Sequence, residues 1–505
     1  MNKTLHAWRW PICIAAIVVM VALHLAAAQQ KSFWEDEAVS ATILQGDWNR
    51  VVFMDAAIHP PLYYLVTAAW VQVFGSSEVG MRSLSVVFAS LSLLVGFQVA
   101  RLLFGIKPAI IFAVFLVLSP LWLTYAPQAR YYAFSTAQVM LMVLALMTYQ
   151  RTQTRKWLAV YVLAGAAALY TVYMSFAAHL VCWVWWLGWF VGLGKQPRIK
   201  LAVEGLLANA LIAVLFMPWF STFTAAVKLQ ADVPGKSLAA LTSEITKYMV
   251  FNLYDFAVGE TLSPLNPVAW LGLGVIALVS VIGVARRTMP RASLFALLMV
   301  LVPLLATTSI SLSMGRVPSP PAPHRTLYAL PFFILLLSVG IAALPKRLAL
   351  VAGMLIASAY LWGQVNFFTN REFMKPLLTA QWKELMQTIK STGAQNIAVI
   401  CNEVDYTCFF YGNLNGLNPR WPADWEEIAT TNPQEVWWIY SNVSSRTNTD
   451  YSHVLAAIRK RYQVEEALDL GPQDASITAF KVRFMQGEAY AHRVNVRHFK
   501  QPNKP

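Results

Sequence analysis

Three adjacent carboxylates, Glu35, Asp36 and Glu37, follow the first apolar run of the chain in the stretch SFWEDEAVS. A carboxylate near apolar surface is partly desolvated, which raises its proton affinity and suits it to general-base chemistry or to holding a divalent cation. Acids in the first turn of a helix also interact favourably with the helix dipole, and EAVSATILQ could form such a helix on the membrane. The residues alone leave both interpretations open.

Three further stretches carry groups that can bind a phosphate. IHPPLYY holds His59 before a Pro-Pro pair that rigidifies the entry to a helix. YAPQARYYAF and PHRTLYALP place Arg130 and Arg325 at the ends of apolar runs, where an arginine pairs with phosphate or extends to lipid headgroups. Each group also suits a structural role, His59 as a turn residue at the interface and the two arginines as headgroup contacts.

The elements that must position these residues are membrane helices. The chain has 505 residues, of which 57% are hydrophobic and 13% are charged, and its mean hydropathy is +0.50. Apolar runs predict about eleven transmembrane helices, at 10–28, 83–104, 108–126, 131–149, 157–173, 175–193, 201–220, 265–285, 292–312, 326–344 and 348–367. The first run predicts a retained helix, with a cleaved signal peptide as the alternative. Pro61–Phe74 is too short to span and predicts an interfacial or re-entrant helix.

The charged residues predict the orientation of these helices. Lysines and arginines gather on one set of loops, whereas every carboxylate before residue 367 except Glu204 falls on the opposite side. The positive-inside rule then places the amino terminus in the cytoplasm and the acid cluster outside it. The net charge of +14 therefore reflects topology. Because the basic residues form no stripe or known binding motif, no nucleic-acid partner is expected.

The composition predicts two domains. A transmembrane domain, 1–369, contains two long outer loops, 29–82 and 221–264, and a soluble α/β domain, 370–505, lies on the outer face. In the second domain the patterns predict helices at 379–393 and 450–462 and strands at 396–402 and 435–441. Of the four cysteines, only Cys401 and Cys408 lie where a disulfide could form.

The four polar stretches occur together and in a fixed order, and in this the chain resembles the type C glycosyltransferase superfamily. WEDEA is similar to the family's tryptophan followed by an Asp-Glu pair in the first outer loop, and HPPLYYLVTAAW to the start of its His-Pro-Pro segment. QARYYAF resembles a Glu-Ala-Arg-x-Tyr element, and HRTLYALPFFILLL an Arg-Tyr-x-x-x-x-Leu-Pro span. The resemblance is to the bacterial protein O-mannosyltransferase-like group, which includes the aminoarabinose transferase acting on lipid A.

The resemblance implies an enzyme of the bacterial inner membrane that moves a monosaccharide, with inversion, from a polyprenyl-phosphate donor. The acceptor at the outer leaflet would be a lipid, a glycan or a protein. Asp36 is implied as the general base, with Glu37 as its support or as an alternative base. The residues implied to contact the donor phosphate or sugar are His59, Arg82, Arg130, Tyr131, Arg325 and Tyr328.

Two positions depart from the family pattern. Gln128 stands where the family often has a second carboxylate, so either a neighbouring acid substitutes for it or the second acid is dispensable. For the same reason no cofactor is expected, and a divalent cation is not favoured. Thr326 replaces the tyrosine that follows the late arginine, which leaves Tyr328 as the nearest phenol.

A membrane transporter or a flippase of a lipid-linked glycan is the alternative from another functional class. Transporter sites use charged residues or broken helices near the bilayer midplane, often within internal repeats. The predicted spans are nearly free of ionisable residues and no repeat is visible, which favours the transferase. A ligase or polymerase of lipid-linked oligosaccharides shares the outward site but accounts less well for the Asp-Glu and His-Pro-Pro motifs.

The predicted orientation is testable with single cysteines at positions 107 and 450. A membrane-impermeant thiol reagent added from outside should leave Lys107→Cys unlabelled and should label Asp450→Cys, because the first lies on the cytoplasmic side and the second outside. Permeabilised cells, in which both positions are accessible, are the control. Labelling of position 107 in intact cells would reverse the assigned orientation.

Overall fold

The computed structural model describes residues 2–44, 59–191, 198–231, 238–285, 290–313, 322–394, 396–401, 406–441, 450–470 and 494–501. Parts of both predicted outer loops, 45–58 and 232–237, lie outside these residues. Contacts divide the chain into two compact units. The first comprises Met1–Ala28 and Gly46–Phe367, and the second comprises Gln29–Gln45 and Phe368–Pro505. The domain limits 1–369 and 370–505 stay a prediction.

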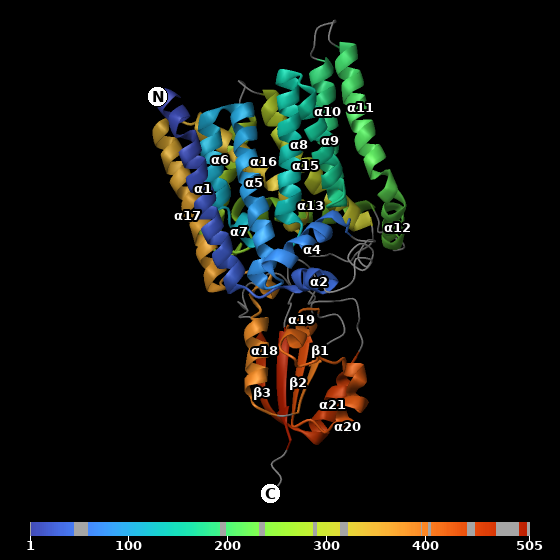
Figure 1. The fold of residues 1–505 in the computed structure, drawn as a ribbon. Coiled ribbons are helices and arrows are strands. Elements are labelled where there is room, and N and C mark those ends of the chain that lie inside the picture. The colour runs from blue at the N-terminus through green and yellow to red at the C-terminus, as the bar shows by residue number, and fades with distance from the viewer. Residues whose placement is uncertain are drawn as a thin grey trace. The chain divides into compact units, whose positions relative to one another are not determined.

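The first unit is built from helices (Figure 1). In chain order they are α1 (Asn2–Gln30, whose last turn enters the second unit), α4 (Leu62–Phe74), α5 (Glu78–Phe104), α6 (Ile106–Leu118), α7 (Pro120–Tyr125), α8 (Tyr132–Thr152), α9 (Arg155–Leu169), η1 (Tyr173–Ser175), α10 (Phe176–Val191), α11 (Arg198–Phe216), η2 (Met217–Trp219), α12 (Phe220–Ala231), α13 (Leu238–Val258), α14 (Pro267–Ala285), α15 (Pro290–Ser313), η3 (Pro323–Ala329), α16 (Leu330–Ala343) and α17 (Lys346–Thr369).

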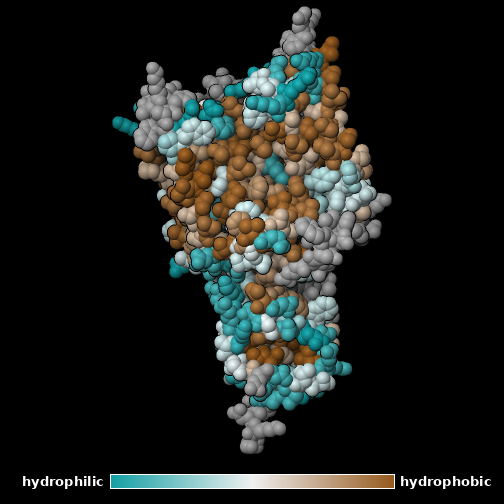
Figure 2. Space-filling view, in the orientation of Figure 1, coloured by the Kyte–Doolittle hydropathy of each residue, from teal (hydrophilic) through white to brown (hydrophobic). Residues whose placement is uncertain are grey.

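Each apolar run that predicted a span is helical over most of its described residues. Within the described part of the chain, eight helices are long and apolar enough to cross a membrane. The other three runs form the shorter helices α6, α9 and α10. The run that contains α6 is broken at Ser119, and α7 begins at Pro120. The Pro61–Phe74 run forms the short helix α4, as predicted. Figure 2 shows apolar side chains over much of the visible face of this helical unit, which is the kind of surface that faces a lipid bilayer.

The predicted loop 221–264 contains helices that the apolar-run criterion missed. Its described residues form most of α12 and the whole of α13. Lys247 and Glu244 interrupt the apolar pattern of α13, which is why the sequence did not predict a span there. The end of α13 is nonetheless buried, since Tyr254, Phe256 and Val258 are almost fully enclosed.

Two helices form the centre of the first unit. In α8, 78% of the most apolar stretch is buried within the protein, and in the segment η3–α16 this share is 89%. Both shares are higher than those of the other candidate spans. Backbones approach closely here: a Cβ atom at Gly340 of α16 would lie 1.8 Å from the carbonyl oxygen of Val279 in α14. Arg130 lies just before α8 and Arg325 lies within η3, so both arginines stand at the amino-terminal ends of these central helices.

The second unit contains a four-stranded sheet of order β1-β2-β4-β3. Its strands are β1 (Ile397–Cys401), β2 (Glu435–Ser441), β3 (Gln463–Leu470) and β4 (Val494–Lys500), with β1 parallel to β2 and the other pairs antiparallel. Its helices are α2 (Glu35–Leu44), η4 (Pro376–Thr379), α18 (Trp382–Ser391), α19 (Tyr406–Leu414), η5 (Pro422–Asp424), α20 (Trp425–Thr430) and α21 (Ser452–Arg461). The four elements predicted in this region are confirmed, whereas α19, α20, β3 and β4 were not predicted.

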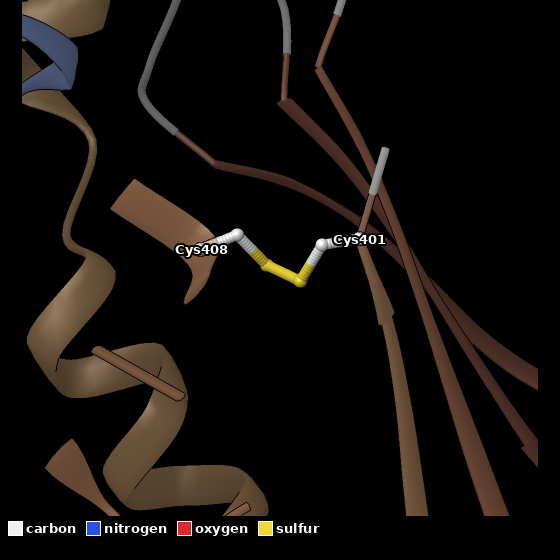
Figure 3. The surroundings of a disulfide bond; sticks show 2 residues. All are labelled: Cys401 and Cys408. Carbon is white, nitrogen blue, oxygen red and sulfur yellow. A yellow bond between two sulfur atoms is a disulfide. The ribbon is translucent and has the colours of Figure 1, made fainter. Parts of the chain in front are cut away.

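The core of the sheet faces α20 and α21. Alternate residues of β2, Val436 and Trp438, pack with Phe499 of β4 and with Ile458 of α21. A disulfide joins Cys401, the last residue of β1, to Cys408 in the first turn of α19 (Figure 3). The cysteine pair that the sequence selected is therefore bonded, and it ties α19 to the sheet.

Candidate active site

Arg130 and His59 form the centre of a buried polar cluster in the first unit. Nη2 of Arg130 lies 3.1 Å from Nε2 of His59, and Nη1 donates to the hydroxyl of Tyr64 at 3.3 Å. Only 3% of Arg130 is exposed. The guanidinium also lies over the ring of Tyr131, 5.6 Å from its centroid, and the same ring lies 5.4 Å from the imidazole. The structure thus brings together three residues that the sequence had selected separately.

A tight turn between α7 and α8 holds Arg130. The backbone N–H of Arg130 donates to the carbonyl of Gln128, and the Gln128 side chain donates back to the carbonyl of Thr124. The hydroxyl of Ser85, on α5, donates to the Gln128 carbonyl at 2.6 Å. Gln128 therefore supports the turn through its backbone and its amide, a role that a carboxylate could not fill because it has no N–H to donate.

The protonation of His59 follows from its surroundings. A guanidinium can only donate, so Nε2 of His59 must accept from Arg130, and the ring proton sits on Nδ1. Burial and the positive charges of Arg130 and Arg325 hold the pKa of His59 well below its ordinary value of 6.5. His59 is consequently neutral at neutral pH, with an Nδ1–H available as a donor. Arg325 acts on this ring through its charge.

A second, acidic group lies along the same chain of aromatic rings. The ring of Tyr132 lies 4.9 Å from Tyr131 and 5.1 Å from His324, and the His324 ring lies 4.8 Å from Tyr125. The hydroxyl of Tyr125 donates to the carboxylate of Glu260. Glu260 is 2% exposed, and Asp255 nearby is also buried. The cluster therefore runs from guanidinium to carboxylate through aromatic side chains in tilted and edge-to-face contact.

The loop that carries Glu260 is held from several sides. Gly259 has φ +82°, and a Cβ atom there would lie 2.7 Å from Pro120, so both the backbone conformation and the space require glycine. Thr261 donates to the carbonyl of Gly363, and its own carbonyl accepts from Asn366. The carboxylate is thus placed against α7 by contacts to α17.

Sequence reasoning missed Tyr64, Tyr125, Glu260 and His324 as members of this cluster. Tyr64, Tyr125 and His324 lie inside the stretches that were singled out, and Glu260 was noted only as a carboxylate of the outer side. A buried acid in a nearly uncharged region was the available signal. The tertiary contact to Tyr125 could not be read from sequence spacing, since the two residues are far apart in the chain.

Arg82 and Tyr328 make contacts that explain their burial structurally. Nη1 of Arg82 donates to the carbonyl of Ala28 near the carboxyl end of α1, where a cation interacts favourably with the helix dipole. The Tyr328 hydroxyl donates to the carbonyl of Met174 at 2.6 Å, which joins η3 to η1. The predicted contacts of Arg82 and Tyr328 with the phosphate or sugar of the glycosyl donor stay predictions.

Asp36 and Glu37 lie in the second unit, in the first turn of α2. The residue Trp34 precedes the helix, and its carbonyl accepts from the N–H groups of Glu37 and Ala38. The Glu37 carboxylate accepts from the backbone N–H of Trp34 at 3.4 Å and is fully buried, as in a capping box. Asp36 is half-buried, and its carbonyl accepts from Ser40. The helix considered for EAVSATILQ is confirmed, and Glu37 contributes to its start.

Comparisons with known proteins agree with this architecture. Residues 58–222 match the family model of the dolichyl-phosphate-mannose-protein mannosyltransferases. The fold is similar to that of apo ArnT from Cupriavidus metallidurans, with a TM-score of 0.59 and 14% identity over 96% of this chain and 97% of that one. For the same ArnT bound to undecaprenyl phosphate, the TM-score is 0.55 at 14% identity, over 97% and 98% of the two chains.

Two further similarities involve other proteins. The Archaeoglobus fulgidus oligosaccharyltransferase tethered with an acceptor peptide gives a TM-score of 0.54 at 10% identity, over 86% of this chain and 69% of that one. Over 83 residues, the chain is 30% identical to L-rhamnose mutarotase of Enterococcus faecalis and covers 76% of that protein. Because this last similarity involves only 16% of the chain, it does not define the class of the whole protein.

The family match places residues 58–222, about a third of the chain, with membrane glycosyltransferases. The fold of nearly the whole chain is similar to that of the ArnT structures.

The lowered pKa of His59 predicts a pH dependence of stability. As pH falls below about 6.5, the unfolded chain takes up a proton at this residue while the folded protein does not, so stability decreases by on the order of 1 kcal/mol. His59→Gln should remove this part of the decrease, measured as the difference in unfolding temperature between pH 7.5 and pH 5. Exchange of the exposed His453 for Gln is the control. An unchanged pH dependence in His59→Gln would contradict the assignment of a neutral imidazole.

Proposed function

We propose that the protein is an inverting glycosyltransferase that moves a monosaccharide from a polyprenyl-phosphate donor to an acceptor at the outer leaflet. The coarser statement, membership of the type C glycosyltransferases, rests on the comparisons above. The observation that carries the finer proposal is the contact of the buried Arg130 with His59, to which Arg325 adds a second positive charge, in the helical unit. Burying positive charge is costly, and an anionic ligand offsets that cost.

A lipid phosphate suits this cluster chemically. Arginine binds phosphate oxygens through two parallel N–H groups, and the Nδ1–H of neutral His59 can donate to a third oxygen. Arg130 also stands at the start of α8, where the helix dipole favours a negative charge. A structure of ArnT with bound undecaprenyl phosphate supports a ligand of this class. A donor that arrives through the lipid phase needs no nucleotide pocket.

The proposed reaction is a single displacement at the anomeric carbon of the donor sugar. Asp36 takes the proton from the acceptor hydroxyl, and the acceptor oxygen attacks the anomeric carbon with inversion. The bond from that carbon to the phosphate oxygen breaks, and its electron pair leaves with the polyprenyl phosphate. Negative charge therefore develops on the phosphate, and positioned cations that stabilise it are usually the largest catalytic contribution. Arg130 and Arg325 take that role in the proposal.

Within the acid cluster, Asp36 is the proposed base because it is half-buried and its carboxylate is not the group that caps α2. Glu37, which is fully buried and bonded to the backbone of Trp34, is proposed to support the helix start. In the first unit, Glu260 is proposed to take the place of the carboxylate that Gln128 lacks. Its partner Tyr125 lies in the same turn as Gln128, whose N–H donates to the Tyr125 carbonyl.

The proposed location is the bacterial inner membrane, with the amino terminus in the cytoplasm and the second unit outside it. The Cys401–Cys408 disulfide supports this orientation, because structural disulfides persist in the periplasm and are rare in the reducing cytosol. The donor is proposed to be a polyprenyl-phosphate monosaccharide, and the acceptor a lipid, a glycan or a protein of the envelope.

The role of Asp36 is testable by comparison with its neighbour. Asp36→Asn should lower sugar transfer by roughly 100- to 10,000-fold, because the amide cannot accept the hydroxyl proton. Glu35→Gln, which removes a charge in the same helical turn, should keep wild-type transfer and is the matched control. The assay uses a panel of radiolabelled undecaprenyl-phosphate monosaccharides, with membranes from a strain that lacks the protein as the source of acceptors. Full transfer by Asp36→Asn would refute the assignment of the base.

If the basic cluster binds the donor phosphate, the loss of one of its side chains should weaken donor binding. Removing one hydrogen-bond donor to the charged phosphate should weaken its binding by about 1.5–3 kcal/mol, roughly 10- to 100-fold in Kd. We therefore expect His59→Ala and Arg325→Ala each to weaken the binding of undecaprenyl phosphate, measured by calorimetry in detergent, with the larger loss for the arginine. Lys156→Ala, which removes an exposed charge of the first unit, is the control. Equal affinity in all four proteins would exclude this cluster as the phosphate site.

A further inference from the structure

The start of α2 is bonded to the helix α19 of the carboxyl-terminal region. The backbone N–H of Phe33 donates to the hydroxyl of Tyr411 at 2.7 Å, and both residues are almost fully buried. The ring of Phe33 packs against Phe410 and Tyr411, with centroids 5.5 and 6.4 Å apart. Phe33 directly precedes Trp34, the residue that caps α2. The phenol thus holds the backbone immediately before the acid cluster.

The hydroxyl of Tyr411 supplies the hydrogen-bond acceptor for the backbone N–H of Phe33. Trp34 directs its N–H to the Glu37 carboxylate, so the N–H of Phe33 is the next backbone donor outside the helix. A buried N–H without an acceptor is strongly unfavourable. Tyr411→Phe would keep the ring and remove the hydroxyl that accepts from the Phe33 N–H. The chain entering α2 would then have to shift to satisfy the Phe33 N–H.

The helix α19 is itself fixed at both ends. Cys408, one turn before Tyr411, is bonded to Cys401, whose N–H donates to the carbonyl of Arg420 (Figure 3). At the other end, a Cβ atom on Gly412 would lie 2.0 Å from Pro419, so the chain packs there without room for a side chain. The position of the Tyr411 hydroxyl relative to the sheet therefore depends on the disulfide.

We propose that Tyr411 is a positioning residue for Asp36 and that the Cys401–Cys408 disulfide keeps Tyr411 in place. Asp36 lies in the first turn of the helix whose entry Tyr411 holds, so a shift of that entry moves the carboxylate. Small displacements of a catalytic group lower the rate of the chemical step more than they weaken substrate binding. The inference rests on the proposed function, since it takes Asp36 as the base.

The first experiment compares Tyr411→Phe with Tyr406→Phe, an exposed tyrosine on the same helix. In the full-length protein, with the undecaprenyl-phosphate monosaccharide that the wild type accepts, Tyr411→Phe should lower kcat roughly 10-fold or more and leave the KM for the donor unchanged. Tyr406→Phe should match the wild type. Equal kcat values in the two variants, or a loss of kcat that only follows a lowered unfolding temperature and folded fraction, would overturn the proposal.

The second experiment removes the disulfide. Dithiothreitol breaks the Cys401–Cys408 bond to two thiols and is itself oxidised to its cyclic disulfide. The wild-type kcat should then fall toward that of Tyr411→Phe, while Tyr411→Phe itself should change little because the held contact is already lost. An unchanged wild-type kcat after complete reduction, verified by thiol titration, would overturn the role of the disulfide.

The outcome for Asp36 separates this inference from the proposed function. If Asp36→Asn is inactive and Tyr411→Phe is fully active, the proposed base stands and the positioning role is wrong. If Asp36→Asn keeps full transfer, the proposed base is wrong whatever Tyr411→Phe does, and a loss of kcat in Tyr411→Phe would then have to act through another group.

Discussion

The burial of a guanidinium in an apolar helical unit is the constraint on which the rest of the first unit depends. Arg130 is almost completely enclosed, and a charge in such surroundings requires partners. Two of its N–H groups contact the imidazole of His59 and the hydroxyl of Tyr64. The neighbouring Arg325 adds a second positive charge. The turn between α7 and α8, the amino-terminal end of α8 and the aromatic rings around them all serve to hold positive charge in this position.

The acidic end of the cluster completes the electrostatic arrangement of the first unit. Glu260 lies on a loop that glycine, threonine and asparagine contacts hold against α7, and its carboxylate bonds the phenol of Tyr125. Aromatic rings in contact with one another lie between Glu260 and Arg130. An arrangement in which opposite charges face different parts of one bound molecule is typical of sites that orient a polar substrate. It agrees with the match of residues 58–222 to a glycosyltransferase family.

In the second unit, the short helix α2 is stabilised by a contact from another helix, α19. The helix α2 has only ten residues and would be marginal by itself. Its start is secured by Glu37 from within the helix and by Tyr411 from α19, which a disulfide ties to the sheet. A helix held in this way can carry acids in its first turn without depending on its intrinsic propensity. The acid cluster that looked like either a cap or a catalytic group contains one residue of the first kind, Glu37.

The sequence by itself predicted most of the membrane helices, and it selected His59 and Arg130, which the structure brings into contact. Apolar periodicity and length follow directly from the chain, because a membrane span must be long, apolar and internally hydrogen-bonded. It could not reveal α13, whose charged residues interrupt the pattern, or the grouping of Glu260 with Tyr125. It also could not divide the acids between capping and other roles. Those assignments depend on contacts between residues remote in the chain, which only the packed tertiary structure decides.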